Sequence, residues 1–587
     1  MKRQQNLHIT KLSASIGSAS HDDATKKLAT LRQLIAKSDN IAQDIPPIIK
    51  NLRQAATVAG ESHPKIEEKF PNKKEPYFAG QYFLHKELAS NLTDLKNIFG
   101  NSEDIIFREF IIGIKNQTKA FLCFIDGLGD KKLIDEYIVK PLLVNIHIID
   151  PSEKLLSYDL FTVLKDHVFN AVEIKQEQVF DEVLNAVLAG NTVLFIDGYD
   201  TVLVMSAKGG EMRSIQEPET EAVVRGSREG FVETLRVNTS LLRRIIKNPK
   251  LTIEPFRLGT QTHTDINIAY IDGIANKKIV EEVKTRLNNI NTNSIISSGS
   301  IEHFIEDAPF SCFATVANSE RPEKLAAKIL EGRVAILVNG TPFVLTVPHL
   351  FIENFQVAED YSSKFHFASF VRLLRLFAFF VTLTMPALYV AVETFHQEML
   401  PTVLLITAAA AREGIPFPCY VEIIIMSAVF ELLRESGVRM PRQIGQAVSI
   451  VGALVVGDAA VRAGLISAPM VIVGAITTIT SFILPSLLEA LLFFRFFLLL
   501  LSAALGLYGF IVGLIIMLAH LCSLRSFGTP YLSPLTPVIW KDLKDSFILA
   551  PLWLMKSLPQ SITWRNGKQG DLAAKTNNPL KKGGENH

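Results

Sequence analysis

The feature that most constrains this sequence is an abrupt change in composition after residue 365. Charged residues occur throughout residues 1–365, whereas long apolar runs dominate residues 376–521. A helix that crosses a bilayer needs about 20 mostly apolar residues, and runs of about this length recur in the second region. We therefore expect a cytoplasmic α/β region of two related subdomains, followed by an all-α polytopic membrane domain.

Four stretches have the length and apolar character of full membrane spans. They are Leu376–Val392, Ile444–Ile466, Pro469–Leu488 and Phe496–His520. Thr402–Ala411 is too short to cross and Pro416–Glu435 is more polar, so we expect re-entrant or interfacial helices there. The second of these carries the membrane carboxylates Glu422, Glu431 and Glu435. Four spans leave both termini on one side, and the Lys- and Arg-rich tail predicts that this side is cytoplasmic.

Four strand-like runs in the soluble region end in a turn signal. These signals are Asp126-Gly127, Asp197-Gly198, Asp272-Gly273 and Asn339-Gly340. The second and fourth lie between two strands, where a two-residue type I′ hairpin favours Asn, Asp and Gly. The first and third precede helical stretches, where Asp126 or Asp272 could cap the helix. The order strand–turn–helix, then helix–strand–turn–strand, occurs twice, which indicates two related α/β subdomains.

These patterns divide the chain into six parts. They are a flexible polar arm (1–80), a first α/β subdomain (84–215), a linker with a basic amphipathic helix (216–250), a second α/β subdomain (251–355), a helical transmembrane domain (366–525) and a cytoplasmic tail (526–587). The first 16 residues are polar, so we expect no secretion signal and a soluble region that stays in the cytoplasm.

Two interpretations of the linker remain open. Its polar first half and its basic helix, Val232–Ile246, are typical of a solvated connection with one packing helix. The alternative is a subunit-contact segment that uses four arginines, namely Arg225, Arg228, Arg243 and Arg244.

The predicted span Ile444–Ile466 combines small and charged residues. Gly445, Ser449 and Gly452 share one helical face, which Val456 extends, and such faces allow close helix packing. Asp458 and Arg462 are four residues apart and can pair. Charged residues within a membrane face protein or water. The span is therefore either a tightly packed bundle helix or a pore-lining helix.

Several classes of function are excluded by what the sequence lacks. A net charge of +1 argues against a nucleic-acid-binding protein. The four cysteines are widely separated and form no metal or disulfide pattern. Signatures for phosphate-binding loops, dinucleotide binding, acyl transfer and zinc proteases are absent. We expect no catalytic site, no metal and no cofactor.

Long stretches of the sequence resemble the A subunits of GerA-type spore germination receptors. They are "VRGSREGFVETLRVNTSLLRR" (224–244), "RPEKLAAKILEGRVAILVNGTPFVLTVP" (321–348), "EDY" (359–361), residues 396–482 and "SFGTPYLSP" (526–534). The resemblance covers residues 100 to 560 approximately, and the two ends of the chain match nothing that we can name.

The resemblance implies a subunit of the spore inner membrane that acts with a transporter-like B subunit and a lipoprotein C subunit. It implies self-association into a homo-oligomer, surrounded by membrane lipid, that opens a path for monovalent cations after nutrient sensing. Val451, Val455 and Val456 could then form an apolar constriction that closes the pore by dewetting. Two alternatives are a non-conducting scaffold for the other subunits and a transporter that binds the nutrient itself.

Overall fold

A computed structural model shows how the two halves of the sequence fold. It describes residues 82–113, 117–145, 161, 164, 173–209, 218, 220–221, 223, 225–439, 457–555 and 558–563. The predicted arm and most of the predicted span Ile444–Ile466 therefore lie outside the described residues.

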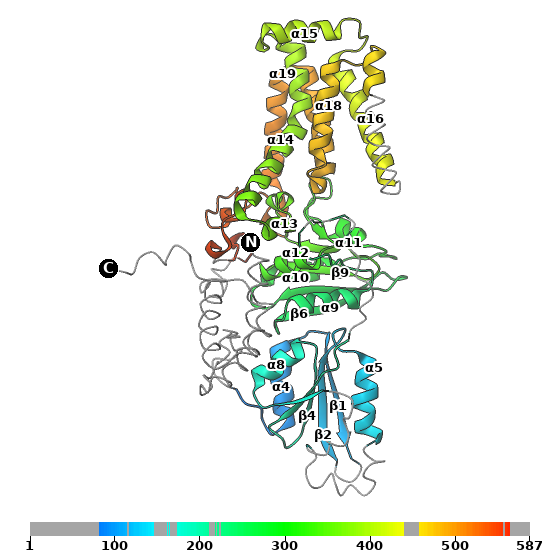
Figure 1. The fold of residues 1–587 in the computed structure, drawn as a ribbon, viewed down its shortest axis with the longest axis vertical. Helices are drawn as coiled ribbons and strands as arrows, with labels where there is room; N and C mark the ends of the chain where they lie inside the picture. Colours follow the sequence, from blue (N-terminus) through cyan, green and yellow to red (C-terminus); the bar gives the residue numbers. More distant parts are fainter. Residues whose placement is uncertain are drawn as a thin grey trace, which may run out of the picture. The chain divides into compact units, whose positions relative to one another are not determined.

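The first subdomain is an antiparallel sheet of five strands with helices on both faces (Figure 1). In spatial order the strands are β1 (Ile105–Ile112), β2 (Thr118–Ile125), β4 (Thr192–Ile196), β5 (Val202–Met205) and β3 (Ile174–Glu177). Helices α4 (Leu88–Phe99) and α8 (Phe180–Leu188) cover one face. The other face packs against α5 (Lys131–Ile134) and the π-helical turns η1 (Asp135–Val139) and η2 (Pro141–Asn145).

Side chains alternate between these two faces, as a pleated strand requires. Phe121 and Phe195 stack at 4.4 Å within the core next to α8, whereas their neighbours Leu122 and Leu194 enter the opposite core. Because both faces are covered, the inner strands β4 and β5 are buried throughout and read as mainly apolar runs in the sequence.

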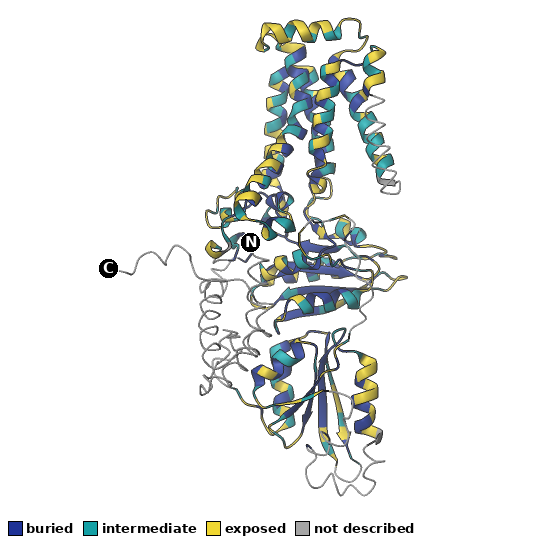
Figure 2. Cartoon of the chain, viewed as in Figure 1, coloured by how far each residue is buried: buried dark blue, intermediate teal, exposed yellow. Residues whose placement is uncertain are grey.

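The second subdomain has the same strand order as the first. Its strands are β6 (Leu251–Leu258), β7 (Thr264–Ile271), β9 (Val334–Val338), β10 (Val344–Val347) and β8 (Ala317–Ser319). One face is covered by α9 (Leu235–Ile245) and α12 (Pro322–Leu330), the other by α10 (Lys277–Asn288) and α11 (Ser298–Ile305). Figure 2 shows the central strands of both sheets in the buried colour, and β4, β5, β9 and β10 are buried at every residue. This is the repeated α/β arrangement that the sequence predicts.

The four predicted turns share one backbone feature but not the predicted turn type. Gly127, Gly198, Gly273 and Gly340 all have φ between 84° and 90°. A two-residue type I′ hairpin is wrong, because residues 197–201 separate β4 from β5 and residues 339–343 separate β9 from β10. The Tyr199 amide donates to the Ile196 carbonyl at 3.4 Å, and Gly198 takes the third position of a type II turn.

The predicted helix caps are also wrong by four residues. The Asp130 carboxylate accepts hydrogen bonds from the amides of Lys132 and Leu133 at the start of α5. The Asn276 side chain accepts from the Lys278 amide at the start of α10. In each unit the turn after the strand is longer than a direct strand-to-helix connection, so the capping position moves along the chain.

The helical region contains five longer helices among the described residues. They are α14 (Phe365–Phe395), α15 (Thr402–Arg412), α16 (Cys419–Arg439), α18 (Ala468–Ser481) and α19 (Leu488–Ser523). Two described stretches are long and apolar enough to cross a membrane, α14 and residues 485–523. The predicted span Pro469–Leu488 corresponds to α18, which has 14 residues and a length of about 21 Å. Four full spans are therefore not confirmed.

Helix α19 reverses direction at Gly506, so the predicted single span Phe496–His520 is wrong. Gly506 has φ 60° and ψ −141°, which is not a helical conformation. The rings of Phe494 and His520 lie 6.0 Å apart, whereas a straight helix would separate residues 26 positions apart by about 39 Å. A Cβ added to Gly513 would lie 2.5 Å from the Leu498 side chain. Helix α19 is therefore a hairpin of two antiparallel arms that pack closely at glycines.

The chain after α19 folds back onto the second subdomain. The Ser526 hydroxyl donates to the Thr315 carbonyl at 2.6 Å and accepts from the His349 amide at 2.9 Å. The Phe351 amide donates to the Tyr531 carbonyl. The sequence predicted a separate tail from residue 526, whereas much of the described part of this segment, up to residue 563, is packed against the rest of the protein.

Candidate functional site

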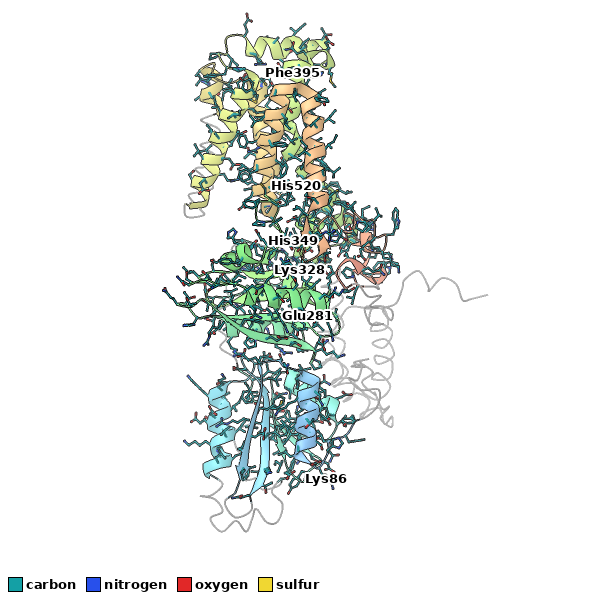
Figure 3. All side chains as sticks on the ribbon, turned by 180° about the vertical axis from the view of Figure 1, so that it is seen from behind. Lys86, Glu281, Lys328, His349, Phe395 and His520 are labelled. Atoms are coloured by element: carbon teal, nitrogen blue, oxygen red, sulfur yellow. The ribbon has the colours of Figure 1, made fainter. Side chains whose placement is uncertain are left out.

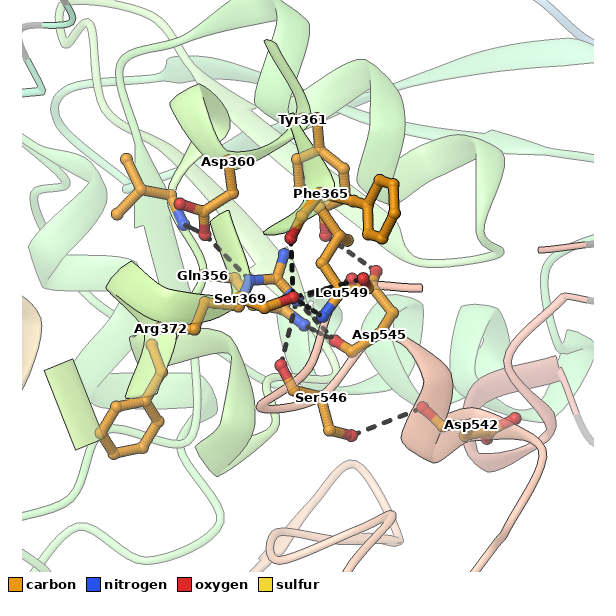
Figure 4. Close-up of polar contacts among 12 residues, drawn as sticks. Gln356, Asp360, Tyr361, Phe365, Ser369, Arg372, Asp542, Asp545, Ser546 and Leu549 are labelled. Atoms are coloured by element: carbon orange, nitrogen blue, oxygen red, sulfur yellow. Dashed lines mark hydrogen bonds and ion pairs between the residues drawn. The ribbon is translucent and has the colours of Figure 1, made fainter. Parts of the chain in front are cut away.

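A cluster of buried ion pairs connects the second subdomain, α14 and the C-terminal segment. Asp360 lies on the short helix α13 (Ala358–Ser362) and its side chain is buried. Its Oδ2 accepts from Arg372 Nε at 3.0 Å and from Arg375 Nη1 at 2.8 Å. Arg372 Nη1 also donates to Asp545 Oδ1 at 2.8 Å (Figure 4). We call Asp360, Arg372, Arg375 and Asp545 the arginine junction.

Backbone carbonyls add further hydrogen bonds to the arginine junction. Arg372 Nη1 donates to the carbonyls of Asp545 and Ser546, and Arg375 Nη1 donates to the Phe355 carbonyl. The two arginines are three residues apart, so they share one face of the first turns of α14. A buried charge is tolerated when it is paired and hydrogen-bonded, and each guanidinium has an ion pair and a carbonyl partner. Arg372 Nη2 has no hydrogen-bond partner among the described residues.

Tyr361 contacts two members of the arginine junction, Asp545 and Arg372. Its hydroxyl donates to Asp545 Oδ2 at 2.8 Å, and its ring lies 5.3 Å from the Arg372 guanidinium. Burial and the nearby Asp545 carboxylate raise the pKa of Tyr361 well above its usual value. Tyr361 therefore stays protonated and keeps donating to Asp545 at neutral pH.

A second charged cluster lies just before α14 and belongs to the second subdomain. The Glu353 carboxylate contacts Lys328 Nζ at 2.8 Å, Arg333 Nη2 at 2.8 Å and His349 Nδ1 at 3.4 Å. Burial alone would raise the pKa of Glu353, but the charges of Arg333 and Lys328 hold this pKa well below its usual range. Burial lowers the pKa of His349, so its ring is neutral at pH 7.

The basic linker helix joins the two sheets within one chain. Arg243 on α9 has a fully buried side chain, and its Nε lies 2.6 Å from Asp104 Oδ2. Arg236, two turns earlier on the same face of α9, lies 3.2 Å from the buried Asp126 carboxylate, which Lys131 also contacts. These contacts explain why α9 is basic, and they argue against Arg243 as a subunit-contact residue.

The other predicted subunit-contact arginines lie on or near the surface. Arg244 pairs with Glu229, and both side chains are partly exposed. Arg225 and Arg228 are exposed. The segment that carries them is held by Arg321, which is buried and donates to the carbonyls of Glu221 and Ser227.

The structure describes two of the eight predicted pore and gating residues. Arg462 Nε lies 2.9 Å from Asp458 Oδ2, as their spacing predicts, and both side chains are more than half exposed. The other six lie outside the described residues: Gly445, Ser449, Val451, Gly452, Val455 and Val456.

The three predicted membrane carboxylates have different environments. Glu422 is fully buried, and its Oε2 accepts from the Ser467 amide and hydroxyl at 2.9 Å each. Glu431 lies 2.6 Å from Arg434 and 3.5 Å from Arg495 on α19. Glu435 is exposed. Within the described residues no group of three or more His, Cys, Asp or Glu side chains could hold a metal ion.

The arginine junction was only partly visible in the sequence. Arg372 and Arg375 stood out as basic residues before an apolar run, and Asp360 belongs to the "EDY" stretch. Nothing in the sequence pairs them with Asp545, which lies about 170 residues further along the chain.

Comparison with known proteins gives a consistent result. A model of the Bacillus/Clostridium GerA spore germination protein family matches residues 93–561. "Spore germination protein KA" of Bacillus subtilis (strain 168) is 45% identical over 482 residues, which are 82% of this chain and 87% of that protein. "Spore germination protein GerLA" of Bacillus cereus is 35% identical, over 81% of this chain and 96% of that protein.

One solved structure is also similar. It is the crystal structure of the N-terminal domain of the A subunit of the Bacillus megaterium spore germinant receptor GerK3. The match is 34% identical, covers 46% of this chain and 98% of that chain, and has a TM-score of 0.35.

Proposed function

Because the chain belongs to the GerA spore germination protein family, we propose that it is a membrane subunit that oligomerises and forms a gated path for monovalent cations. In this proposal it is the A subunit of a nutrient-sensing receptor in the spore inner membrane, with both termini in the cytoplasm. Its partners are a transporter-like B subunit and a lipoprotein C subunit. Opening of the path triggers germination.

The observation that carries the proposal is the arginine junction. Gating requires that a change in the soluble region or its partners moves the membrane helices. The junction joins α13, the first turns of α14 and the C-terminal segment through buried ion pairs and hydrogen bonds. Tightly packed and hydrogen-bonded contacts of this kind transmit small displacements instead of absorbing them.

The membrane region also supports the proposal. Arg495 on α19 is buried and faces Glu431 on α16. A charge within the hydrocarbon core is costly, and such residues mark polar paths or tight helix contacts. Helix α19 is a hairpin, so it begins and ends on the same side of the helical region. The segment after α19 meets the start of α14 at the arginine junction. This supports the proposal that both termini lie on one side of the membrane.

Conduction can be tested with the full-length chain in liposomes. We expect rubidium uptake that changes several-fold when Gly452 or Val455 is replaced by phenylalanine, because a bulky group would alter the proposed constriction. Ile472→Phe on α18 is the matched control, since Ile472 is largely exposed on an apolar helix. Equal uptake for all these variants and for empty liposomes would contradict the proposal.

Gating can be tested in the receptor assembled with its partner subunits. Arg372→Gln removes the charge that joins Asp360 to Asp545. We expect basal rubidium leak to remain and the nutrient-dependent increase to be lost. A normal nutrient response in this variant would show that the signal does not pass through the junction.

The second candidate function is a non-conducting scaffold that couples the other two subunits. It is favoured by the surface position of Arg225 and Arg228 on a segment that Arg321 fixes to α12. Charge reversal of Arg225 and Arg228 should then prevent co-purification of the partner subunits. If conduction fails and this loss is observed, the scaffold function replaces the channel function.

A further inference from the structure

Two buried carboxylates share one guanidinium at one end of the helical region. Glu393 ends α14 and Glu422 begins α16, and the two side chains are 6% and 0% exposed. Arg412, at the end of α15, lies between them. Phe395, labelled in Figure 3, marks this end, opposite the end at which His520 lies.

The contacts of Arg412 are loose. Its Nη1 lies 3.6 Å from Glu393 Oε1, and its Nη2 lies 3.5 Å from Glu422 Oε1. Both distances are longer than those of charge-assisted hydrogen bonds, which are about 2.7–2.9 Å. Glu422 Oε1 accepts no hydrogen bond from the described residues, although Glu422 is fully buried.

The charges at this place do not balance. Two carboxylates and one guanidinium leave one negative charge in excess when both glutamates are ionised. In the part of the chain that the structure describes, the ion pairs of Glu393 and Glu422 all go to Arg412. An uncompensated buried charge strongly destabilises the folded protein. The site therefore requires one more positive charge.

We propose that Glu393, Glu422 and Ser467 form a binding site for one monovalent metal cation, Na⁺ or K⁺. Glu422 Oε1 is the principal ligand, because its other oxygen is already occupied by the Ser467 amide and hydroxyl. The Ser467 hydroxyl donates its proton to Glu422, so its oxygen keeps lone pairs with which it can act as a second ligand. Carboxylate and hydroxyl oxygens suit hard cations.

The excess charge selects a monovalent cation over a divalent one. One cation with a single charge neutralises the site, whereas a divalent ion would leave one positive charge in excess beside Arg412. Arg412 acts as an internal cation that competes with the bound ion. It lies on α15, a helix with no buried residue, so few contacts oppose its displacement.

The idea that cations pass through this site on their way across the membrane rests on the proposed function. Binding itself does not, because a cation that binds only the folded protein stabilises it whether or not ions flow. At ten times the dissociation constant, such a ligand raises the ratio of folded to unfolded protein about elevenfold. Binding and conduction can therefore fail separately.

The test measures thermal unfolding of the purified full-length chain in detergent. KCl, NaCl and N-methyl-D-glucamine chloride are compared at equal ionic strength. We expect K⁺ or Na⁺ to raise the apparent Tm with concentration and the large organic cation to have no such effect. Arg412→Gln should lower the half-saturating cation concentration several-fold, because it removes the competing internal charge.

Glu422→Gln should abolish the cation dependence, and Glu435→Gln, on the exposed part of the same helix, should retain it. If Glu422→Gln does not fold, the response of Arg412→Gln alone still decides the question. Equal Tm values in all three salts for both wild type and Arg412→Gln would overturn the proposal. Stabilisation by acid alone, without a cation effect, would also overturn it and identify a proton as the missing charge.

Discussion

Three buried arginines lie where two parts of this chain meet. Arg243 joins the two sheets, Arg321 holds the linker, and Arg372 joins α14 to the C-terminal segment. Each is at most 1% exposed. Paired charges of this kind add little net stability compared with apolar contacts, but removal of one partner is costly. They therefore fix how the parts of the chain are arranged.

The ion pair between Arg243 and Asp104, which joins the two sheets, predicts a large effect of substitution on stability. Arg243→Ala would leave the buried Asp104 carboxylate without its cation. We expect a loss of about 3–5 kcal/mol in the free energy of unfolding, measured as a shift in the denaturant or thermal midpoint of the full-length chain. Arg244→Ala is the matched control, because its pair with Glu229 is partly exposed and should change stability by less than about 1 kcal/mol. Equal effects of the two substitutions would refute this role for Arg243.

The acidic group at Glu302 predicts a pH dependence. Burial, followed by the charges of Glu306 and Glu489, raises the pKa of Glu302 to about 7. The folded state then binds the proton more tightly than the unfolded state does, so this group makes stability fall as pH rises from about 4.5 to 7. Glu302→Gln should flatten the Tm profile across that range, whereas Glu281→Gln on the exposed side of α10 should not. An unchanged profile in Glu302→Gln would be the contrary result.

At this scale the sequence predicted the turn glycines but not the partners of the charges. Glycine at positive φ is a local property, so Gly127 and Gly273 could be identified from the dipeptides alone. The capping residues Asp130 and Asn276 depend on how long each turn is, which the dipeptides do not specify. Arg243 was noticed as a basic residue, but Asp104 lies 139 residues away in the sequence.

Among the elements, the α19 hairpin departs most from expectation. Composition is the same for one long apolar helix and for two antiparallel arms, so hydropathy does not distinguish them. Glycines are common in membrane helices, and Gly506 therefore gave no clear signal. Its conformation is disfavoured for other residues, and a Cβ there would lie 2.9 Å from the Phe395 Cβ. The turn thus depends on one glycine.

Cross-linking tests the hairpin. In a chain whose own cysteines are replaced by alanine, Phe494→Cys combined with His520→Cys should be linked within one chain by a short bifunctional thiol reagent, because the two native rings are 6.0 Å apart. Phe494→Cys with Tyr508→Cys is the control, since Tyr508 lies next to the turn and about 18 Å further along the arm. Absence of the first cross-link in a folded chain would favour a continuous helix. Gly506→Val should also reduce its yield.

For the whole molecule, the sequence predicted a soluble α/β half and a helical half, and the described residues show both. It did not predict that the segment after α19 returns to the second subdomain. Residues 526–555 were predicted to be a tail because they follow the last predicted span. Their contacts are with residues 170 to 220 positions earlier, and no local pattern reports such contacts.

Hydrogen exchange can measure how firmly this segment is held. Arg372→Gln should make amides near Ser546 and Leu549 exchange roughly a hundredfold faster, which corresponds to the loss of about 3 kcal/mol. Amides of β2 in the first subdomain should be unchanged. Lys541→Gln, at an exposed position of the same segment, is the control. Faster exchange throughout the chain would instead indicate general unfolding.

The return of the chain to the second subdomain also has a consequence for biosynthesis. The rings of Phe313 and Phe351 pack against Tyr531, which leaves the ribosome only after every helix of the membrane region. Until then the side of these two rings that Tyr531 covers stays open to water or to a chaperone. Folding of the α/β half is thus completed only after the last residues have been translated. A nascent chain stalled before residue 531 would expose an aromatic surface that is prone to aggregate.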